Sequence, residues 1–319
     1  MNSELVTYAR VAFGWNGDIT VNAGPRGALG QIWRVQIGPD RYALKEIFAE
    51  PSSPARIAAE LDFAGRAVSA GIRLPASHPD RDGRYLVTTP DGTWLRLYEW
   101  VDMVPVDPAN PETLGALLAR LHRCAKATTT EPGGDPAVDW YDRVPTASEW
   151  ASLARTVWGP RFAAAVATLP ELCAAVAPVD PAALIMCHRD LHPENILADH
   201  SGRLVVVDWD NFGAAEPGRE LAGVFFDWYC DGDADLEAMA SLYRAYVDEG
   251  GPGRITGPAD FTMLLATRLN FLLLQARIAL DPRSGARERE WAEHEIDEML
   301  RLLPTPRQLA DVLSLVGGR

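Results

Sequence analysis

The feature of the sequence that most restricts its fold is a polar segment enclosed by two short apolar runs. The runs, Ala183–Cys187 and Leu204–Val207, have the length of buried strands, and a turn signal at 199–202 precedes the second one. Residues 188–195 between them read His-Arg-Asp-Leu-His-Pro-Glu-Asn, and Asp-Trp-Asp follows at 208–210. The pattern predicts two neighbouring strands whose polar ends meet on one side.

The spacing of three oxygen-bearing side chains in this region indicates metal chemistry. Asp190 and Asn195 lie on the loop that leaves the first apolar run, and Asp208 lies at the end of the second. Carboxylate and amide oxygens are hard ligands that suit Mg²⁺, which completes its shell with phosphate oxygens and water. The spacing therefore predicts a metal site formed by the amide oxygen of Asn195 and one or both of the carboxylates of Asp190 and Asp208. A carboxylate that does not bind the metal can orient a hydroxyl group and accept its proton.

These residues resemble the catalytic and metal-binding loops of the protein-kinase-like fold. The form His-x-Asp-Leu-His-Pro-x-Asn at 188–195, with Asp-Trp-Asp at 208–210, is similar to that of the aminoglycoside phosphotransferase and small-molecule kinase family. Residues 216–222, Glu-Pro-Gly-Arg-Glu-Leu-Ala, resemble the D-P-x-x-D-L-A of that family, with glutamates in place of both aspartates. Arg189 stands where the family usually has glycine. The resemblance implies Asp190 as the catalytic residue and Asn195 and Asp208 as the metal ligands. Asp210 is either a secondary neighbour of the metal or a loop cap, and we favour the cap. We expect Glu220 to anchor the catalytic loop through Arg189.

The resemblance implies an α+β, two-lobed protein-kinase-like fold with a small antiparallel β-sheet N-lobe and a larger, mainly helical C-lobe. Residues 1–100 would form the N-terminal nucleotide-binding lobe, 101–108 the hinge or linker, and 109–319 the C-terminal catalytic and substrate-binding lobe. Local signals agree with this division. Residues 19–100 carry strand and hairpin signals around one helical stretch at 55–70, and helical periodicity dominates the rest of the chain.

The resemblance also assigns residues of the N-terminal half to a nucleotide site. Lys45 is one of only two lysines in the chain, and it is similar to the strand lysine that contacts the α- and β-phosphates. Glu60, on the predicted helix, is its expected partner. A glycine-bearing loop would bring backbone N–H groups to the phosphates, and a hinge would pair with the adenine edge. The residues assigned to the loop and the hinge are Gly24, Gly27 and Gly30, and Glu99, Trp100 and Val101.

The implied reaction is transfer of the γ-phosphate of ATP or GTP, with Mg²⁺, to a hydroxyl group of a small molecule. A peptide acceptor is disfavoured because 208–210 runs almost directly into 216–222, where protein kinases carry an activation segment of roughly 20 to 30 residues. Acidic residues at 227–235 are candidates for binding an aminoglycoside-like or other hydroxylated antibiotic. The candidates are Asp227, Asp231 and Asp233. The same stretch suits a solvated loop in which Asp233 or Asp235 caps the next helix.

Two other functions remain open beside an enzyme that confers antibiotic resistance. The first is a kinase of an endogenous metabolite, such as an amino alcohol or a sugar. The second, from a different class, is a catalytically inactive nucleotide-binding regulatory protein. Such a protein would be expected to have lost a group that the chemistry needs. The four groups in question are all present: Lys45, Asp190, Asn195 and Asp208.

The composition limits the partners and the location of the chain. Its 30 basic and 44 acidic residues give a formal charge of −14, which argues against binding to nucleic acids or to anionic membranes and is compatible with a cationic small molecule. The four scattered cysteines predict free thiols in a reducing compartment. The apolar stretch Phe261–Leu280 contains two arginines, an asparagine and a glutamine, so we expect it to be too polar to span a bilayer and to form a buried amphipathic helix. With no signal-peptide pattern at the N-terminus, the sequence predicts a cytoplasmic protein.

Overall fold

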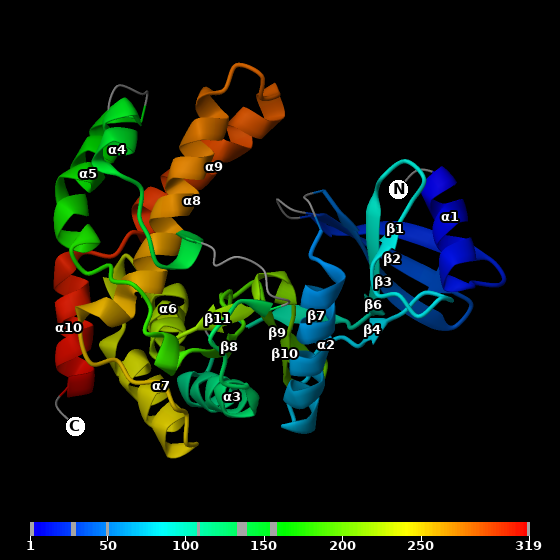
Figure 1. Cartoon of the computed structure of the whole chain (residues 1–319), viewed down its shortest axis with the longest axis horizontal. Helices are drawn as coiled ribbons and strands as arrows, with labels where there is room; N and C mark the ends of the chain where they lie inside the picture. Colours follow the sequence, from blue (N-terminus) through cyan, green and yellow to red (C-terminus); the bar gives the residue numbers. More distant parts are fainter. Residues whose placement is uncertain are drawn as a thin grey trace. The chain divides into compact units, whose positions relative to one another are not determined.

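The computed structural model describes residues 3–26, 30–48, 51–106, 109–132, 139–153 and 158–317. The chain forms two compact units, whose elements are labelled in Figure 1. Unit 1 is built mainly from Met1–Pro105 and Glu194–Asp210. Unit 2 is built from Val106–Glu131, Pro136–Pro193 and Asn211–Arg319.

An antiparallel sheet forms the centre of unit 1. Its strands are β1 (Ile19–Arg26), β2 (Gly30–Ile37), β3 (Asp40–Ile47), β4 (Ser77–His78), β5 (Val87–Thr88) and β6 (Trp94–Glu99). The strand order is β1-β2-β3-β6-β4, and β5 also pairs with β6. The register places Lys45 of β3 opposite Arg96 of β6. The predicted antiparallel sheet of the N-terminal region is thus confirmed.

Two helices accompany this sheet in unit 1. Helix α1 (Ser3–Phe13) buries Leu5 and Ala9 in the apolar core of the sheet. Helix α2 (Pro54–Ser69) begins where the side chain of Ser53 accepts a hydrogen bond from the Arg56 N–H. Such a cap, followed by proline in the first turn, is a strong helix start. The helix predicted at 55–70 is confirmed, whereas α1 was not predicted because a short helix with only two buried residues leaves a weak periodic signal.

A second, three-stranded sheet completes unit 1 and carries the Asp-Trp-Asp segment. It contains β7 (Met103–Pro105), β9 (Ile196–Asp199) and β10 (Leu204–Val206) in the antiparallel order β10-β9-β7. The β9–β10 turn is closed by the carboxylate of Asp199, which accepts hydrogen bonds from the N–H groups of Ser201 and Arg203. The pairing of β7 with β9 explains why Glu194–Asp210 belongs to unit 1, although it follows residue 109 in the chain.

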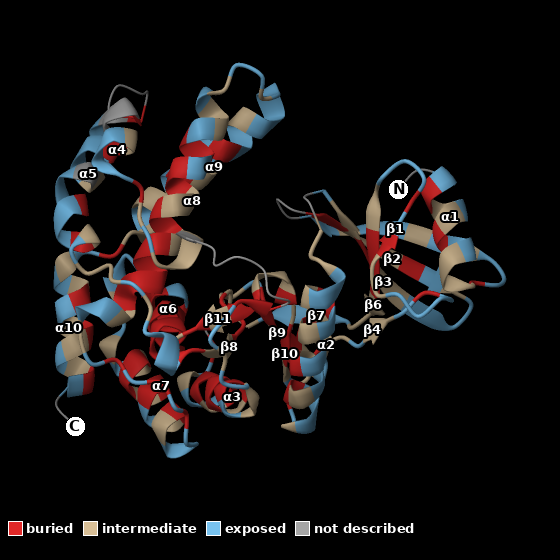
Figure 2. Cartoon of the chain, viewed as in Figure 1, coloured by how far each residue is buried: buried red, intermediate tan, exposed pale blue. Residues whose placement is uncertain are grey.

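Unit 2 is mainly helical. Its helices are α3 (Pro111–Cys124), α4 (Ala147–Leu153), α5 (Gly159–Cys173), α6 (Pro217–Tyr229), α7 (Leu236–Asp248), α8 (Thr262–Leu280), α9 (Ala286–Leu302) and α10 (Pro306–Gly317). Two short antiparallel pairs join β8 (Ile185–Cys187) to β11 (Gly213–Ala215) and β12 (Cys230–Asp231) to β13 (Asp233–Ala234). Helix α6 is buried over nearly its whole length (Figure 2), so it forms the centre of this unit. The four cysteines are free, as predicted.

Helix α8 differs from its prediction in two respects. We expected the polar residues of this stretch to exclude a membrane span. By length and composition alone, however, Pro258–Leu280 is long and apolar enough to cross a membrane. In the structure, α8 packs against α6 and α9, and its buried residues lie on several faces of the helix. It is therefore a core helix, as predicted, but not an amphipathic one. Its buried Arg268 is neutralised by the carboxylate of Asp227, 2.7 Å away.

The packing of α3 against α7 gives a test of the fold. A Cβ atom at Gly115 would overlap the backbone of Leu242, which has no flexible side-chain atom that can move away. Gly115→Ala is therefore expected to lower the free energy of unfolding by about 2 kcal/mol through overpacking, measured by urea denaturation. Gly65→Ala, in α2, is the control, because its Cβ would meet nothing within 4 Å. Alanine there should stabilise the chain by up to about 1 kcal/mol, and equal effects at both sites would contradict the packing described.

Candidate active site

The β9–β10 hairpin brings the two predicted metal ligands of unit 1 to the same end. Ile196 pairs with Val206, and one step further along the ladder the Val207 N–H donates to the Asn195 carbonyl, 3.0 Å away. Asp208 therefore follows directly beside Asn195, with its backbone in the left-handed region at φ 55°. Asparagine and aspartate offer the oxygen donors that a divalent metal such as Mg²⁺ prefers.

The side chain of Lys45 joins this end of the hairpin to the first sheet. Its Nζ atom donates to Asp208 Oδ1 at 2.8 Å and to Asp210 Oδ2 at 2.7 Å. Burial alone would lower the pKa of Lys45, but the two carboxylates raise it above its usual value, so the lysine is charged. Asp210 was predicted to cap a loop; its carboxylate instead forms this ion pair. Two carboxylates thus share one lysine, and the excess negative charge suits an additional cation.

The predicted ion pair between Lys45 and Glu60 is wrong. Glu60, on α2, instead binds Arg96 of β6 through two hydrogen bonds of 2.8 Å, and both side chains are buried. Burial raises the pKa of Glu60, and Arg96 opposes this rise. Arg96 stands opposite Lys45 in the strand register, so both side chains lie on the same face of the sheet, and the forked guanidinium of Arg96 binds both oxygens of Glu60 in place of the lysine. Arg96 also lies 3.5 Å from Asp210 Oδ1.

The predicted phosphate loop is shorter than the sequence indicated. Gly24 lies within β1 and Gly30 begins β2, so both are strand residues, and Gly27 lies outside the described residues. The side chain of Gln31 donates to the carbonyl of Gly24 at 2.9 Å. A Cβ atom at Gly30 would lie 2.6 Å from the carbonyl oxygen of Glu46, which explains the glycine by close strand packing. A phosphate-binding role for these glycines stays a prediction.

The predicted hinge residues follow the end of β6. Glu99 ends this strand, and its carboxylate binds Arg73 in a bidentate pair at 2.9 and 2.5 Å. Its backbone N–H donates to the carbonyl of Ala76 at 2.8 Å. Trp100 and Val101 come next, as an irregular segment. The contact of these residues with an adenine ring stays a prediction.

The candidate catalytic residue, Asp190, belongs to unit 2 and is held by a residue that the sequence analysis missed. The side-chain amide of Asn211 donates to Asp190 Oδ2 at 3.0 Å. The Nε2 atom of His192 lies 3.5 Å from Asp190 Oδ1. The signal for Asn211 in the sequence was its position directly after Asp-Trp-Asp, but nothing local indicated which group its amide would bind.

A buried acid anchors the residue before Asp190. Glu220 of α6 accepts a hydrogen bond from the backbone N–H of Arg189, so the predicted anchor is confirmed, through the backbone of Arg189. The other carboxylate oxygen of Glu220 lies 2.6 Å from Nε2 of His122, whose Nδ1 lies 2.7 Å from the hydroxyl of Tyr246. Burial would raise the pKa of Glu220, but the hydrogen bonds from His122 and the Arg189 N–H lower it below 4.5. The acid is therefore ionised.

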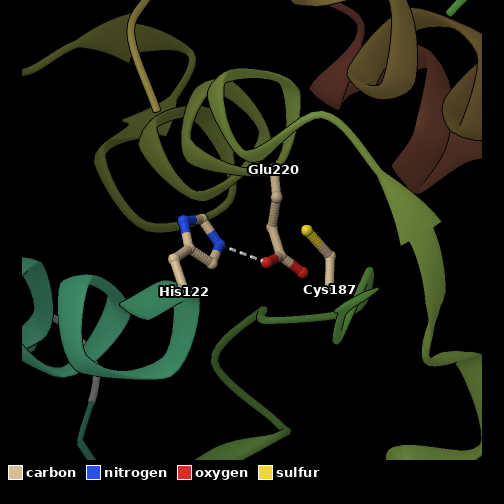
Figure 3. A group of neighbouring side chains, drawn as sticks. All are labelled: His122, Cys187 and Glu220. Atoms are coloured by element: carbon tan, nitrogen blue, oxygen red, sulfur yellow. Dashed lines mark hydrogen bonds and ion pairs between the residues drawn. The ribbon is translucent and has the colours of Figure 1, made fainter. Parts of the chain in front are cut away.

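The same group has a composition that could suggest a metal centre. The ligand atoms of His122, Cys187 and Glu220 lie within 4.8 Å of one another, and all three residues are buried. Figure 3 shows the imidazole directed at the carboxylate, to which it is hydrogen bonded. Both ring nitrogens and both carboxylate oxygens already have hydrogen-bond partners. We therefore interpret the group as a structural anchor of the catalytic segment.

The acidic residues predicted to bind the acceptor have different surroundings. Asp227 forms the ion pair with Arg268, and Asp231 pairs with Arg301. Asp233 is exposed and forms no ion pair with any residue that the structure describes. Asp235 caps α7 by accepting a hydrogen bond from the Ala238 N–H at 3.0 Å, so one of the two predicted caps is confirmed. Arginines therefore balance two of the three candidate charges.

Comparison with known proteins agrees with this geometry. The family described as "Phosphotransferase enzyme family" (APH) matches residues 20–255, and the chain belongs to this family. It is thus a phosphotransferase, of the kinase type that acts on alcohol groups. No sequence among the curated proteins matches the chain. The resemblance inferred from residues 188–195, 208–210 and 216–222 is confirmed.

Solved structures show the same fold. A microcompartment-associated aminopropanol kinase is 19% identical, with a TM-score of 0.70 over 98% of this chain and 100% of that one. An amicoumacin kinase, in complex with AMP-PNP, Ca²⁺ and its antibiotic, is 17% identical, with a TM-score of 0.62 over 97% of both chains. A spectinomycin phosphotransferase with ADP and spectinomycin is 13% identical, with a TM-score of 0.63 over 99% of both. The predicted protein-kinase-like fold is confirmed.

The Glu220 anchor predicts a pH-dependent stability. Because folding lowers the pKa of Glu220, its ionised carboxylate stabilises the chain fully above pH 4.5, and this contribution is lost as the pH falls further. Glu220→Gln should lower the free energy of unfolding at pH 7 by about 2 kcal/mol, since it mispairs His122 or the Arg189 N–H. The difference from the unsubstituted chain should narrow below pH 4.5. The exposed Glu237→Gln, in the first turn of α7, is the control and should cost less than about 1 kcal/mol; an equal cost for both variants at pH 7 would argue against the anchor.

Proposed function

We propose that the chain transfers the γ-phosphoryl group of ATP or GTP to a hydroxyl group of a small molecule, with Mg²⁺ as the metal. The observation that carries this proposal is the end of the β9–β10 hairpin, where Asn195 and Asp208 lie together and Lys45 binds Asp208 at 2.8 Å. One lysine, one carboxylate and one amide oxygen are the groups that phosphoryl transfer needs around a nucleotide and its metal.

Each residue has a distinct task in this mechanism. Asn195 and Asp208 would hold Mg²⁺, which neutralises charge on the phosphate oxygens when it is bound. Lys45 would exchange a carboxylate contact for the nucleotide phosphates and position them. Asp190 orients the acceptor hydroxyl and takes its proton as the bond to phosphorus forms. Because positioning and charge stabilisation supply most of the rate in such reactions, the fixed orientation of these side chains matters more than their intrinsic reactivity.

The first candidate acceptor is a hydroxylated antibiotic of the aminoglycoside type, which would give the chain a role in resistance in the cytoplasm. The amicoumacin kinase and the spectinomycin phosphotransferase with the same fold support this proposal. A second candidate is a small amino alcohol. It is favoured by the arginines that neutralise Asp227 and Asp231, because this pairing leaves less free negative charge for a polycation. The aminopropanol kinase, with its TM-score of 0.70, agrees with this second candidate.

Replacement of the proposed base tests the reaction. Asp190→Asn should reduce kcat by about 10² to 10⁴, because the amide cannot accept the hydroxyl proton. The Kd for MgATP, measured by calorimetry, should change by less than about threefold, since Asp190 does not hold the nucleotide. The exposed Asp248→Asn, on α7, is the control and should keep full turnover. Wild-type kcat in Asp190→Asn would contradict the assignment.

The acceptor is identified by a panel assay. The chain is incubated with Mg²⁺, labelled ATP or GTP, and aminoglycosides, spectinomycin, other hydroxylated antibiotics, sugars and amino alcohols including aminopropanol. Label on an antibiotic selects the first candidate, and label on an amino alcohol or a sugar selects a metabolite kinase. Tight nucleotide binding without transfer to any acceptor would contradict the proposed activity and favour a regulatory protein.

The charge of the acceptor can be tested separately at Asp233, the candidate acid without an ion pair among the described residues. For a cationic acceptor, Asp233→Lys should raise the KM for that acceptor by about tenfold and leave kcat nearly unchanged, because it removes uniform binding energy. The matched control is Asp248→Lys, an exposed charge reversal at the end of α7. Equal KM values for both variants and the unsubstituted chain would exclude Asp233 from the acceptor site.

A further inference from the structure

The side chain of Arg189 is buried, although arginine is seldom found in the interior of a protein. Only 5% of the residue is exposed, and its backbone has φ 66°. A non-glycine residue with positive φ is uncommon, and it persists only where the surroundings hold it. The backbone contact that holds it is the hydrogen bond to Glu220. The hydrogen bond to Glu220 therefore fixes the backbone of Arg189 and, with it, the direction of the Arg189 side chain.

The guanidinium group of Arg189 binds the segment that follows Asp-Trp-Asp. Its Nε donates to the carbonyl of Asn211 at 2.7 Å, and its Nη2 donates to the carbonyl of Phe212 at 3.2 Å. It lies directly against Gly213, where any Cβ atom would overlap its nitrogen atoms. Because Gly213 has no side chain, the guanidinium group of Arg189 can pack directly against its backbone.

Two further residues hold the guanidinium group from outside this segment. Glu131 binds Nη1 at 2.8 Å, and both members of this pair are buried. The ring of Tyr141 lies 4.0 Å from the guanidinium carbon, in a cation–π contact. A buried positive charge is tolerated when a carboxylate and several acceptors surround it. Glu131 is therefore the group that allows Arg189 to remain in the interior.

The contacts close a ring at the proposed base. Asn211 accepts a hydrogen bond from Arg189 through its carbonyl, and its side-chain amide donates to Asp190 at 3.0 Å. Asp190 follows Arg189 directly in the chain. We infer that Arg189, Glu131 and Asn211 form a clamp that positions the carboxylate of Asp190 for proton transfer. This inference rests on the proposed function of Asp190. The sequence indicated Arg189 only as a contact of Glu220, and it indicated no role for Glu131 or Asn211.

The clamp adds a chain of contacts to the contact that His192 makes with the other carboxylate oxygen of Asp190, 3.5 Å away. Loss of the Asn211 amide removes the contact at Oδ2, and a displacement of the carboxylate by about 1 Å can cost about 10² in rate. The nucleotide is proposed to bind through Lys45, Asn195 and Asp208, which are not part of the clamp. Loss of the clamp should therefore lower kcat without weakening nucleotide binding.

The first test removes the contact with Asp190. Asn211→Leu has nearly the same volume but no donor, and it should lower kcat by about 10- to 100-fold. The Kd for MgATP should stay within about threefold, and the melting temperature within about 3 °C. The control is Asn16→Leu, an exposed position, which should keep wild-type kcat. Turnover is measured as ADP formed from MgATP with the acceptor that gives the fastest rate in the panel.

The second test asks whether Arg189 acts through Asn211. Arg189→Met retains a long unbranched side chain but removes the guanidinium group and its hydrogen bonds. It should also lower kcat by about tenfold or more. In the double variant with Asn211→Leu, the loss in kcat should equal that of the more severe single variant, because both changes interrupt one route. Losses that multiply would mean that the two residues act independently and would overturn the clamp.

Two outcomes separate the clamp from the proposed function. If the unsubstituted chain turns over in a manner that depends on Asp190, while Asn211→Leu keeps kcat within about twofold, the clamp is wrong and the function stands. If Asp190→Asn keeps turnover, or the unsubstituted chain shows none with any acceptor, both fail. The clamp is supported only by a loss of kcat in Asn211→Leu with nucleotide binding retained.

Discussion

The hydrogen bond between the backbone N–H of Arg189 and the buried carboxylate of Glu220 is the contact on which the catalytic segment depends. A carboxylate is stable at this depth because His122 also lies 2.6 Å from it, and Tyr246 in turn lies 2.7 Å from His122. Helices α3, α6 and α7 therefore converge on one acid. The acid fixes the left-handed backbone of Arg189, which sends the side chain into the interior and leaves Asp190 as the next residue of the loop.

The second determinant is the distribution of charge in unit 1. Glu60 and Arg96 neutralise each other inside the sheet, whereas Lys45 faces two carboxylates, Asp208 and Asp210. The lysine is thus not committed to the helix acid that sequence reasoning assigned to it. Arg96 also lies 3.5 Å from Asp210, so the cluster holds two cations, Lys45 and Arg96, against the three carboxylates of Glu60, Asp208 and Asp210. This excess of negative charge suits a site that takes up a divalent cation together with an anionic nucleotide. The acidic end of the β9–β10 hairpin and Lys45 are thus both consistent with binding of a nucleotide and its metal ion.

The sequence predicted the fold because the motif at 188–195 and 208–210 is contiguous and identifies the family. Asn195 and Asp208 flank one hairpin, β9–β10, so their proximity follows from that hairpin alone. The prediction that the apolar runs 183–187 and 204–207 are neighbouring strands is wrong: β8 pairs with β11, and β10 pairs with β9, a strand nearer in sequence that had not been predicted. The residues that support the site could not be predicted, because each contact joins distant parts of the chain. Arg96 meets Glu60 through the register of β3 and β6, and His122 meets Glu220 through helix packing. No local pattern specifies such pairings.

The most direct test of the central claim is the stoichiometry of phosphorus in the reaction, followed by ³¹P NMR with MgATP and the acceptor panel. Direct transfer to a hydroxyl predicts one phosphate monoester signal from the acceptor for each ADP formed, and no comparable rise in inorganic phosphate. Formation of ADP with inorganic phosphate as the sole second product would show transfer to water. That result, or the absence of ADP with every acceptor, would contradict a small-molecule phosphotransferase.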